Sequence, residues 1–235
     1  MPITARPDHV AVAVPSIEAA SRRWIDELGA VWLRPPFDSA ETGFGARQAR
    51  FPSGAKLELL EPRGEDSFVG HFLARRGAGV HHVTLSVPDL LGAVAIVREA
   101  GYDVVDVSAE GDHWHEGFLR PSQVGGMIVQ LAWIGYREPD GPVSPPSGPP
   151  EGAPVPRLLG PRLAHPDLAV AASLWELLGA TVTRGDDRLH VGWPDAPLDI
   201  EVVRGETPGP LGLRFADAPE RPGDEVVGAA ILPAT

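Results

Sequence analysis

Cysteine is absent from the 235 residues of this chain. Its absence excludes disulfides, iron–sulfur clusters, thiol nucleophiles and thiolate zinc sites, so any metal ion must bind to histidine, carboxylate or amide ligands. Basic residues are also scarce, because 20 Lys and Arg stand against 32 Asp and Glu and give a formal net charge of −12. An acidic chain without a basic segment is a poor partner for nucleic acid or for an anionic membrane surface, and we expect neither partner.

Long apolar runs and a leader sequence are missing as well. No apolar stretch approaches the roughly 18 residues of a membrane span, and residues 1–8 lack the basic and apolar pattern of a signal peptide. We therefore expect a soluble, cytoplasmic protein that acts on a small-molecule substrate as a monomer or homodimer. Hydrophobic residues make up 43% of the chain, which is enough to bury a core.

Proline is concentrated in one segment of the chain. Residues 136–156 hold eight prolines and three glycines, a composition typical of an extended spacer rather than of a helix or a sheet strand. We therefore predict one domain over residues 1–135, a linker over 136–156 and a second domain over 157–235.

The first domain contains an internal repeat. Residues 9–17 (HVAVAVPSI) and 82–90 (HVTLSVPDL) share a histidine, an apolar strand pattern and a Val-Pro pair at an offset of 73. Proline ends the strand in each copy, Ser16 and Asp89 are typical helix N-caps, and Gly29 is a typical helix stop. Each copy therefore predicts a strand, a helix and about three further strands.

Four polar residues stand at matching positions of the two copies, namely His9 and Glu58 in the first and His82 and Gln130 in the second. Glu58 and Gln130 each lie in an apolar strand and are 72 residues apart, almost the offset of the histidines. Two imidazoles, one carboxylate and one amide oxygen suit a divalent ion of Co, Ni, Mn, Fe or Zn. We therefore predict a metal site with open positions for a substrate.

The competing interpretation is structural. A histidine on an apolar strand is often a core residue, and Glu58 could face solvent on a half-exposed strand, but independent surface residues have no reason to keep a matched offset. Because side chains alternate along a strand, Ala11 and Ala13 share the face of His9. These side chains are small, so we expect them to leave room for a ligand.

Several stretches of the first domain resemble the vicinal oxygen chelate superfamily, which includes glyoxalases, bleomycin-resistance proteins and extradiol dioxygenases, and within it the methylmalonyl-CoA epimerase-like members. They are residues 8–10 (DHV), 56–62 (KLELLEP), 72–77 (FLARRG), 79–83 (GVHHV), 118–121 (FLRP) and 125–131 (GGMIVQL). The resemblance implies an α+β fold in which paired βαβββ modules form a curved, partly open mixed sheet around a metal site. It also implies that the four polar residues named above hold a divalent metal, one from each of four strands.

Residues 157–235 repeat this theme faintly. Residues 209–215 (GPLGLRF) are typical of the entry into a further copy. Leu159 and Gly212 stand where the two histidines would be, and only Glu201 matches a ligand position of the first domain. We therefore predict a degenerate, truncated third and fourth module without a metal site.

The chain departs from the family pattern at two amides. Family members usually carry glutamate where Gln130 stands, and epimerases carry a glutamate base where our alignment places Gln48. An amide cannot accept the α-proton of a substrate. We predict that His113, His115 or Glu116 carries out the proton transfer, because imidazoles titrate near neutrality; the alternative is a polar loop that packs around a tryptophan.

These features predict a metal-dependent enzyme that stabilises the enolate of a small carbonyl or acyl-thioester substrate, as an epimerase, an isomerase or a glyoxalase-type lyase. Two alternatives remain open. The first is an Fe(II)-dependent extradiol-type dioxygenase, although Gln130 provides no carboxylate in the last strand. The second is a non-catalytic protein that binds a small molecule and confers resistance to it.

Overall fold

The computed structural model describes residues 1–39, 41–135 and 155–234 of the chain. Most of the predicted linker, residues 136–154, lies outside the described residues. The predicted domain boundaries on either side of it therefore stay a prediction.

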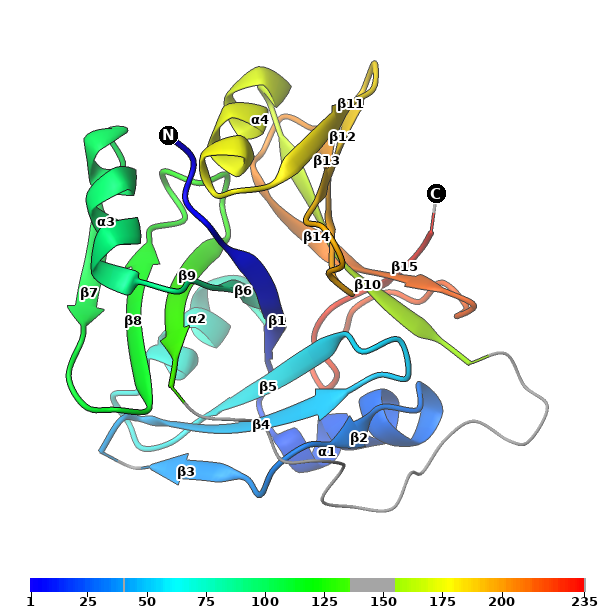
Figure 1. The fold of residues 1–235 in the computed structure, drawn as a ribbon. Coiled ribbons are helices and arrows are strands. Elements are labelled where there is room, and N and C mark those ends of the chain that lie inside the picture. Colours follow the sequence, from blue (N-terminus) through cyan, green and yellow to red (C-terminus); the bar gives the residue numbers. More distant parts are fainter. Residues whose placement is uncertain (40, 136–154, 235) are drawn as a thin grey trace. The chain divides into compact units, whose positions relative to one another are not determined.

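The first sheet has nine strands and contains both copies of the repeat (Figure 1). The strands of the first copy are β1 (Arg6–Ala13), β2 (Val31–Trp32), β3 (Phe37–Ser39), β4 (Phe44–Arg50) and β5 (Lys56–Pro62). Those of the second copy are β6 (Gly79–Ser86), β7 (Val104–Ser108), β8 (Trp114–Leu119) and β9 (Ile128–Ile134). The strand order is β2-β4-β5-β1-β6-β9-β8-β7, and β3 pairs with β4.

The second sheet has six strands in the order β11-β12-β13-β10-β14-β15. Their bounds are β10 (Arg157–His165), β11 (Thr181–Arg184), β12 (Arg188–Gly192), β13 (Ile200–Arg204), β14 (Gly209–Ala216) and β15 (Ile231–Pro233). The helical elements are α1 (Ile17–Ser21), the π-helical turn η1 (Arg22–Glu27), α2 (Phe68–Arg76), α3 (Leu90–Glu99) and α4 (Leu168–Leu177).

Three successive modules follow one plan. In each module the first and last strands pair in parallel, as β1 with β5, β6 with β9 and β10 with β13. One middle strand pairs antiparallel with the last strand, and an outer middle strand pairs antiparallel with that one; in the first module the short β3 also pairs with β4. A helix follows the first strand each time, so the predicted α+β class with mixed sheets and more than one βαβββ module is confirmed.

Local signals start and stop the helices where the sequence predicts. The side-chain oxygens of Ser16 and Asp89 accept hydrogen bonds from the backbone N–H groups of Ala19 (3.3 Å) and Gly92 (3.1 Å). Gly29 ends the first helical segment with a φ of +76°, a conformation that favours glycine. The π-helical form of η1 is not predicted.

The described residues form two compact units, each built from separate segments of the chain. One unit contains most of the second and third modules. In it, α3 packs against β7, β8 and β9, and α4 packs against β11, β12 and β13 (Figure 1). Gly126 lies close to the third module here, since a Cβ at this position would meet the carbonyl oxygen of Pro208 at 2.5 Å.

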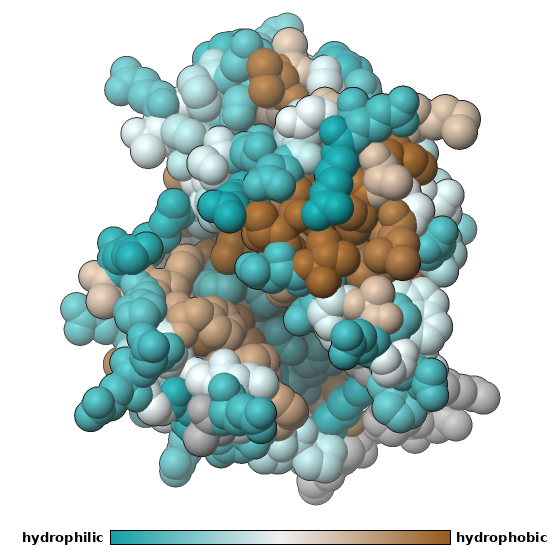
Figure 2. Space-filling view, turned by 90° about the vertical axis from the view of Figure 1, so that its left-hand side faces the viewer, coloured by the Kyte–Doolittle hydropathy of each residue, from teal (hydrophilic) through white to brown (hydrophobic). Residues whose placement is uncertain are grey.

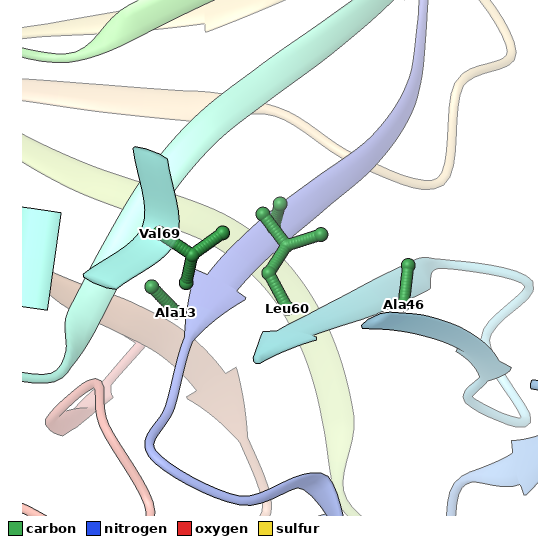
Figure 3. Close-up of a cluster of buried hydrophobic side chains, with 5 residues drawn as sticks. Ala13, Ala46, Leu60 and Val69 are labelled. Carbon is green, nitrogen blue, oxygen red and sulfur yellow. The ribbon is translucent and has the colours of Figure 1, made fainter. Parts of the chain in front are cut away.

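The other unit contains most of the first module together with β14 and β15. Its core includes a cluster of buried side chains on β1, β4, β5 and α2, namely Ala11, Ala13, Ala46, Leu60 and Val69. Figure 3 shows that Val69 and Leu60 extend over β1 beside Ala13. Helix α2 is absent from our sequence prediction, although Ser67 caps its first turn by accepting a hydrogen bond from Gly70 N–H.

Apolar side chains also reach the surface of the molecule. Figure 2 shows a brown apolar area with teal hydrophilic side chains around it on the face that it draws. Leu91 on α3 and Val170 on α4 are among the exposed apolar residues. Among the described residues, no helix has the length and apolar character needed to cross a membrane.

Replacing Leu60 by alanine removes the largest side chain of the buried cluster. We expect Leu60→Ala to lower the free energy of unfolding by about 2–5 kcal/mol, because the lost contacts leave a cavity. The exposed Leu91→Ala is the control and is expected to change it by less than about 0.5 kcal/mol. Chemical denaturation measures both values, and equal effects would contradict the packing described here.

Candidate metal centre

The ladder of the first module determines what faces Glu58. Ala11 on β1 is the parallel partner of Glu58 on β5, and Gln48 on β4 is its antiparallel partner. Directly paired residues share a face of the sheet. The Gln48 amide donates a hydrogen bond from Nε2 to Glu58 Oε1 at 3.1 Å. Gln48 is thus in direct contact with one of the predicted metal ligands.

The second module repeats this arrangement one for one. Thr84 on β6 is the parallel partner of Gln130 on β9, and Phe118 on β8 is the antiparallel partner. Thr84 therefore takes the place of Ala11, and Gln130 takes the place of Glu58. His82 lies two residues before Thr84, just as the first histidine lies two residues before Ala11.

The two histidines are buried and lie near each other. His9 is 1% exposed and His82 is 6% exposed, and their ring centroids are 5.6 Å apart in an edge-on contact. One ligand atom of each histidine and a carboxylate oxygen of Glu58 all lie within 4.8 Å of one another. These three residues could hold a metal ion, because two imidazole nitrogens and one anionic oxygen converge.

Hydrogen-bond partners constrain the protons of His9. Thr84 donates its hydroxyl proton to Gln130 Oε1 at 2.5 Å, so its oxygen can only accept from His9 Nε2, which lies 3.1 Å away. His9 Nδ1 lies 2.7 Å from Asp8 Oδ2, and a carboxylate likewise needs a donor. Both hydrogen bonds form when the His9 ring is protonated at Nδ1 and at Nε2. A cation bound at Nε2 would take the place of the Nε2 proton.

The amide of Gln130 connects this network to Glu116. Gln130 Nε2 donates to Glu116 Oε2 at 2.7 Å, and Trp114 Nε1 donates to the same oxygen at 2.7 Å. Of the three residues predicted to transfer protons, Glu116 therefore has a direct contact with a predicted metal ligand.

His113 is exposed just before β8, and His115 lies on β8. The ring of His115 stacks on Trp133 with centroids 4.6 Å apart, and its Nε2 lies 2.8 Å from the carbonyl oxygen of Gly111. His115 is adjacent to Glu116 on β8, so the two side chains point to opposite faces of the sheet. The role of His113 and His115 in proton transfer stays a prediction.

The space over the small residues of β1 is filled. Ala11 and Ala13 are fully buried beneath Val69, with Phe72 and Leu73 packed around the cluster. The expectation that these alanines leave room for a ligand is therefore corrected. These alanines instead belong to the same buried apolar cluster as Val69 of α2.

His81 is a core residue of the protein. Its ring lies 4.7 Å from that of Phe72, measured between centroids. Burial lowers the pKa of His81 to about 4, and the nearby charge of Glu58 only partly opposes this shift. The imidazole is therefore neutral at neutral pH.

The third module carries different residues at the positions that correspond to the candidate metal ligands. Arg162 on β10 is the parallel partner of Glu201 on β13, so it stands where the first two modules carry alanine and threonine. Arg162 Nε donates a hydrogen bond to Glu201 Oε2, and Arg188 Nη1 lies 3.5 Å from Oε1. The histidine position falls on Gly160 in this register, one residue beyond the Leu159 of the sequence alignment. A guanidinium thus neutralises Glu201.

The order of elements, the ladders and the site geometry agree with one protein class. Residues 8–118 match the family model of the Glyoxalase/Bleomycin resistance protein/Dioxygenase superfamily. The chain belongs to this superfamily, and the resemblance noted in the sequence is confirmed.

Among its relatives the chain is similar to acyl-CoA epimerases. It is 37% identical over 134 residues to the ethylmalonyl-CoA/methylmalonyl-CoA epimerase of Cereibacter sphaeroides, covering 55% of this chain and 98% of that one. It is 36% identical over 129 residues to the mitochondrial methylmalonyl-CoA epimerase of Bos taurus, covering 54% and 73%. The structure of methylmalonyl-CoA epimerase from Mycobacterium tuberculosis aligns with a TM-score of 0.50 at 26% identity, covering 55% and 87%.

A longer structural likeness extends over both sheets. A mutant 4-hydroxymandelate synthase from Streptomyces coelicolor aligns with a TM-score of 0.65, covering 92% of this chain and 71% of that one. The sequence identity is 15%, so this likeness establishes the fold alone.

Glu201 offers a test of the third module. We expect Glu201→Gln to lower the free energy of unfolding by about 3 kcal/mol, because it removes the carboxylate charge that accepts a hydrogen bond from the largely buried Arg162. Glu176→Gln is the control, since its ion pair with Arg184 is about half exposed and contributes less than about 1 kcal/mol. Equal losses in thermal or chemical denaturation would show that the Arg162 pair has no special role.

Proposed function

We propose that this protein is a metal-dependent enzyme that stabilises the enolate of an acyl-thioester or other small carbonyl substrate. The observation that carries the proposal is the convergence of His9, Glu58 and His82, whose ligand atoms lie within 4.8 Å of one another. The similarity to acyl-CoA epimerases supports an epimerase or related isomerase over a glyoxalase-type lyase.

The residues present fit a divalent cation. His9 and His82 are nearly inaccessible to solvent, and their neutral nitrogens with one carboxylate oxygen form a ligand set that suits Co, Ni, Mn, Fe or Zn. Gln130 would add an amide oxygen as the fourth ligand, as the family pattern implies. A bound ion would supply positive charge beside the substrate oxygen on which enolate charge develops.

The protein's own residues prepare this centre. Asp8 lies on Nδ1 of His9, so a cation would bind at Nε2 in place of the proton that faces Thr84, in the manner of carboxylate–histidine pairs at metal sites. The Gln48 amide donates to Glu58 and orients its carboxylate. Because Gln48 cannot take up a proton, the α-proton would be moved by His113, His115 or Glu116.

Two other functions would use the same scaffold. The Fe(II)-dependent dioxygenase alternative stays open, although Gln130 provides no carboxylate in the last strand. A protein that only binds a small molecule would need no proton carrier. Fold alone does not separate these functions, so the experiments below measure metal binding and chemistry separately.

His82→Ala tests the metal centre. We expect it to weaken binding of Co²⁺ by more than about 100-fold, because losing a ligand exceeds the effect of altering an outer residue. Isothermal titration calorimetry and elemental analysis measure the affinity and the stoichiometry. His71→Ala is the matched control, since that side chain is 58% exposed; stoichiometric metal retained in His82→Ala would refute the assignment.

Solvent exchange tests the chemistry. In D₂O we expect the metal-loaded protein to introduce deuterium at the α-carbon of methylmalonyl-CoA or ethylmalonyl-CoA, which mass spectrometry detects. Removal of the metal, or His82→Ala, should slow the exchange by about 100-fold or more. Oxygen consumption without exchange would favour the dioxygenase, and ligand binding without either reaction would favour the binding protein.

A further inference from the structure

The orientation of the Gln130 side chain is determined by its neighbours. An amide can present either its oxygen or its NH₂ group in a given direction. Glu116 Oε2 can only accept, so the NH₂ group of Gln130 must face it, at 2.7 Å. The amide oxygen is then turned the other way, where it accepts a hydrogen bond from Thr84 at 2.5 Å.

This orientation decides whether Gln130 can be a metal ligand. Only the amide oxygen has lone pairs to offer to a cation, and the NH₂ group would repel one. Thr84 Oγ1, which contacts that oxygen, also lies 3.1 Å from His9 Nε2. The oxygen therefore faces the side of the network on which the buried imidazole lies.

A carboxylate at position 116 also accounts for the amide at position 130. Two carboxylates in hydrogen-bond contact repel each other unless one takes up a proton. Trp114 Nε1 donates a hydrogen bond to Glu116 at 2.7 Å and holds its carboxylate in place. The neighbouring residue Gln130, an amide, can lie against this carboxylate without repulsion. An amide at position 130 avoids this repulsion and can donate to Glu116.

We propose that Glu116 is a positioning residue that turns the Gln130 amide oxygen toward the metal site, with Trp114 holding Glu116 in place. This inference rests on the proposed metal site and assigns Glu116 to ligand orientation rather than to proton transfer. Oε2 of Glu116 accepts two hydrogen bonds, from Trp114 and from Gln130. These bonds fix the orientation of the Gln130 amide.

Two variants at position 116 separate shape from hydrogen bonding. Glu116→Met keeps the size of the side chain but removes the acceptor, so the amide is free to rotate. We expect Glu116→Met to weaken Co²⁺ binding by about 10- to 100-fold, as measured by calorimetry. Glu116→Gln retains an acceptor oxygen and is expected to stay within about threefold of the unaltered protein. Glu110→Met, at an exposed position of the preceding loop, is the control.

The exchanged pair Glu116→Gln with Gln130→Glu reverses the order of acid and amide. The amide at 116 can then donate to the carboxylate at 130, and we expect Co²⁺ to bind at least as tightly as to the unaltered protein. Gln130→Glu alone should have a lower free energy of unfolding without metal than the exchanged pair, because it places two carboxylates together.

A readout without metal keeps the inference separate from the proposed function. In NMR spectra of the metal-free protein, the side-chain NH₂ signals of Gln130 should be distinct and protected. They should move toward free-amide positions in Glu116→Met and return in Glu116→Gln. Unchanged signals and unchanged Co²⁺ affinity in Glu116→Met would overturn the positioning role. If the unaltered protein takes up no Co²⁺, the proposed function fails, and a metal-orienting role for Glu116 fails with it even if the NH₂ signals move.

Discussion

The parallel pairing of the first and last strand in each module is the constraint on which the candidate site depends. Hydrogen bonds between β1 and β5, and between β6 and β9, determine which side chains share a face. A shift of one residue in either ladder would turn Glu58 or Gln130 to the other side of the sheet. The backbone ladders therefore set the positions of the candidate metal-binding residues. Side-chain hydrogen bonds then only adjust the orientation of these side chains.

Much of this arrangement could be predicted from the sequence, because the signals are local and repeated. Ser16 and Asp89 cap helices as their residue types predict, and the offset shared by the histidines reflects two copies of one ladder. Helix α2 was missed although Ser67 and Gly77 flank it as cap and stop. Without this helix, nothing in the sequence indicates that the alanines of β1 share a buried cluster with Val69.

Contacts between distant side chains could not be predicted in the same way. The hydroxyl of Thr84 donates a hydrogen bond to Gln130, which is 46 residues away in the chain. Gln130 in turn meets Glu116 across the ladder of β8 and β9. No periodicity in the sequence carries such information, because each bond depends on rotamers that are chosen once the strands have paired.

Arg162 has a consequence for the third module that goes beyond its ion pair. A guanidinium bound covalently to the chain cannot dissociate, be chelated or be exchanged for a competing ion, and it stays charged across the physiological pH range. The carboxylate of Glu201 therefore always has its counter-charge within the same polypeptide. The charge balance at this position of the third module therefore needs no metal ion, in contrast to the site proposed for the first two modules.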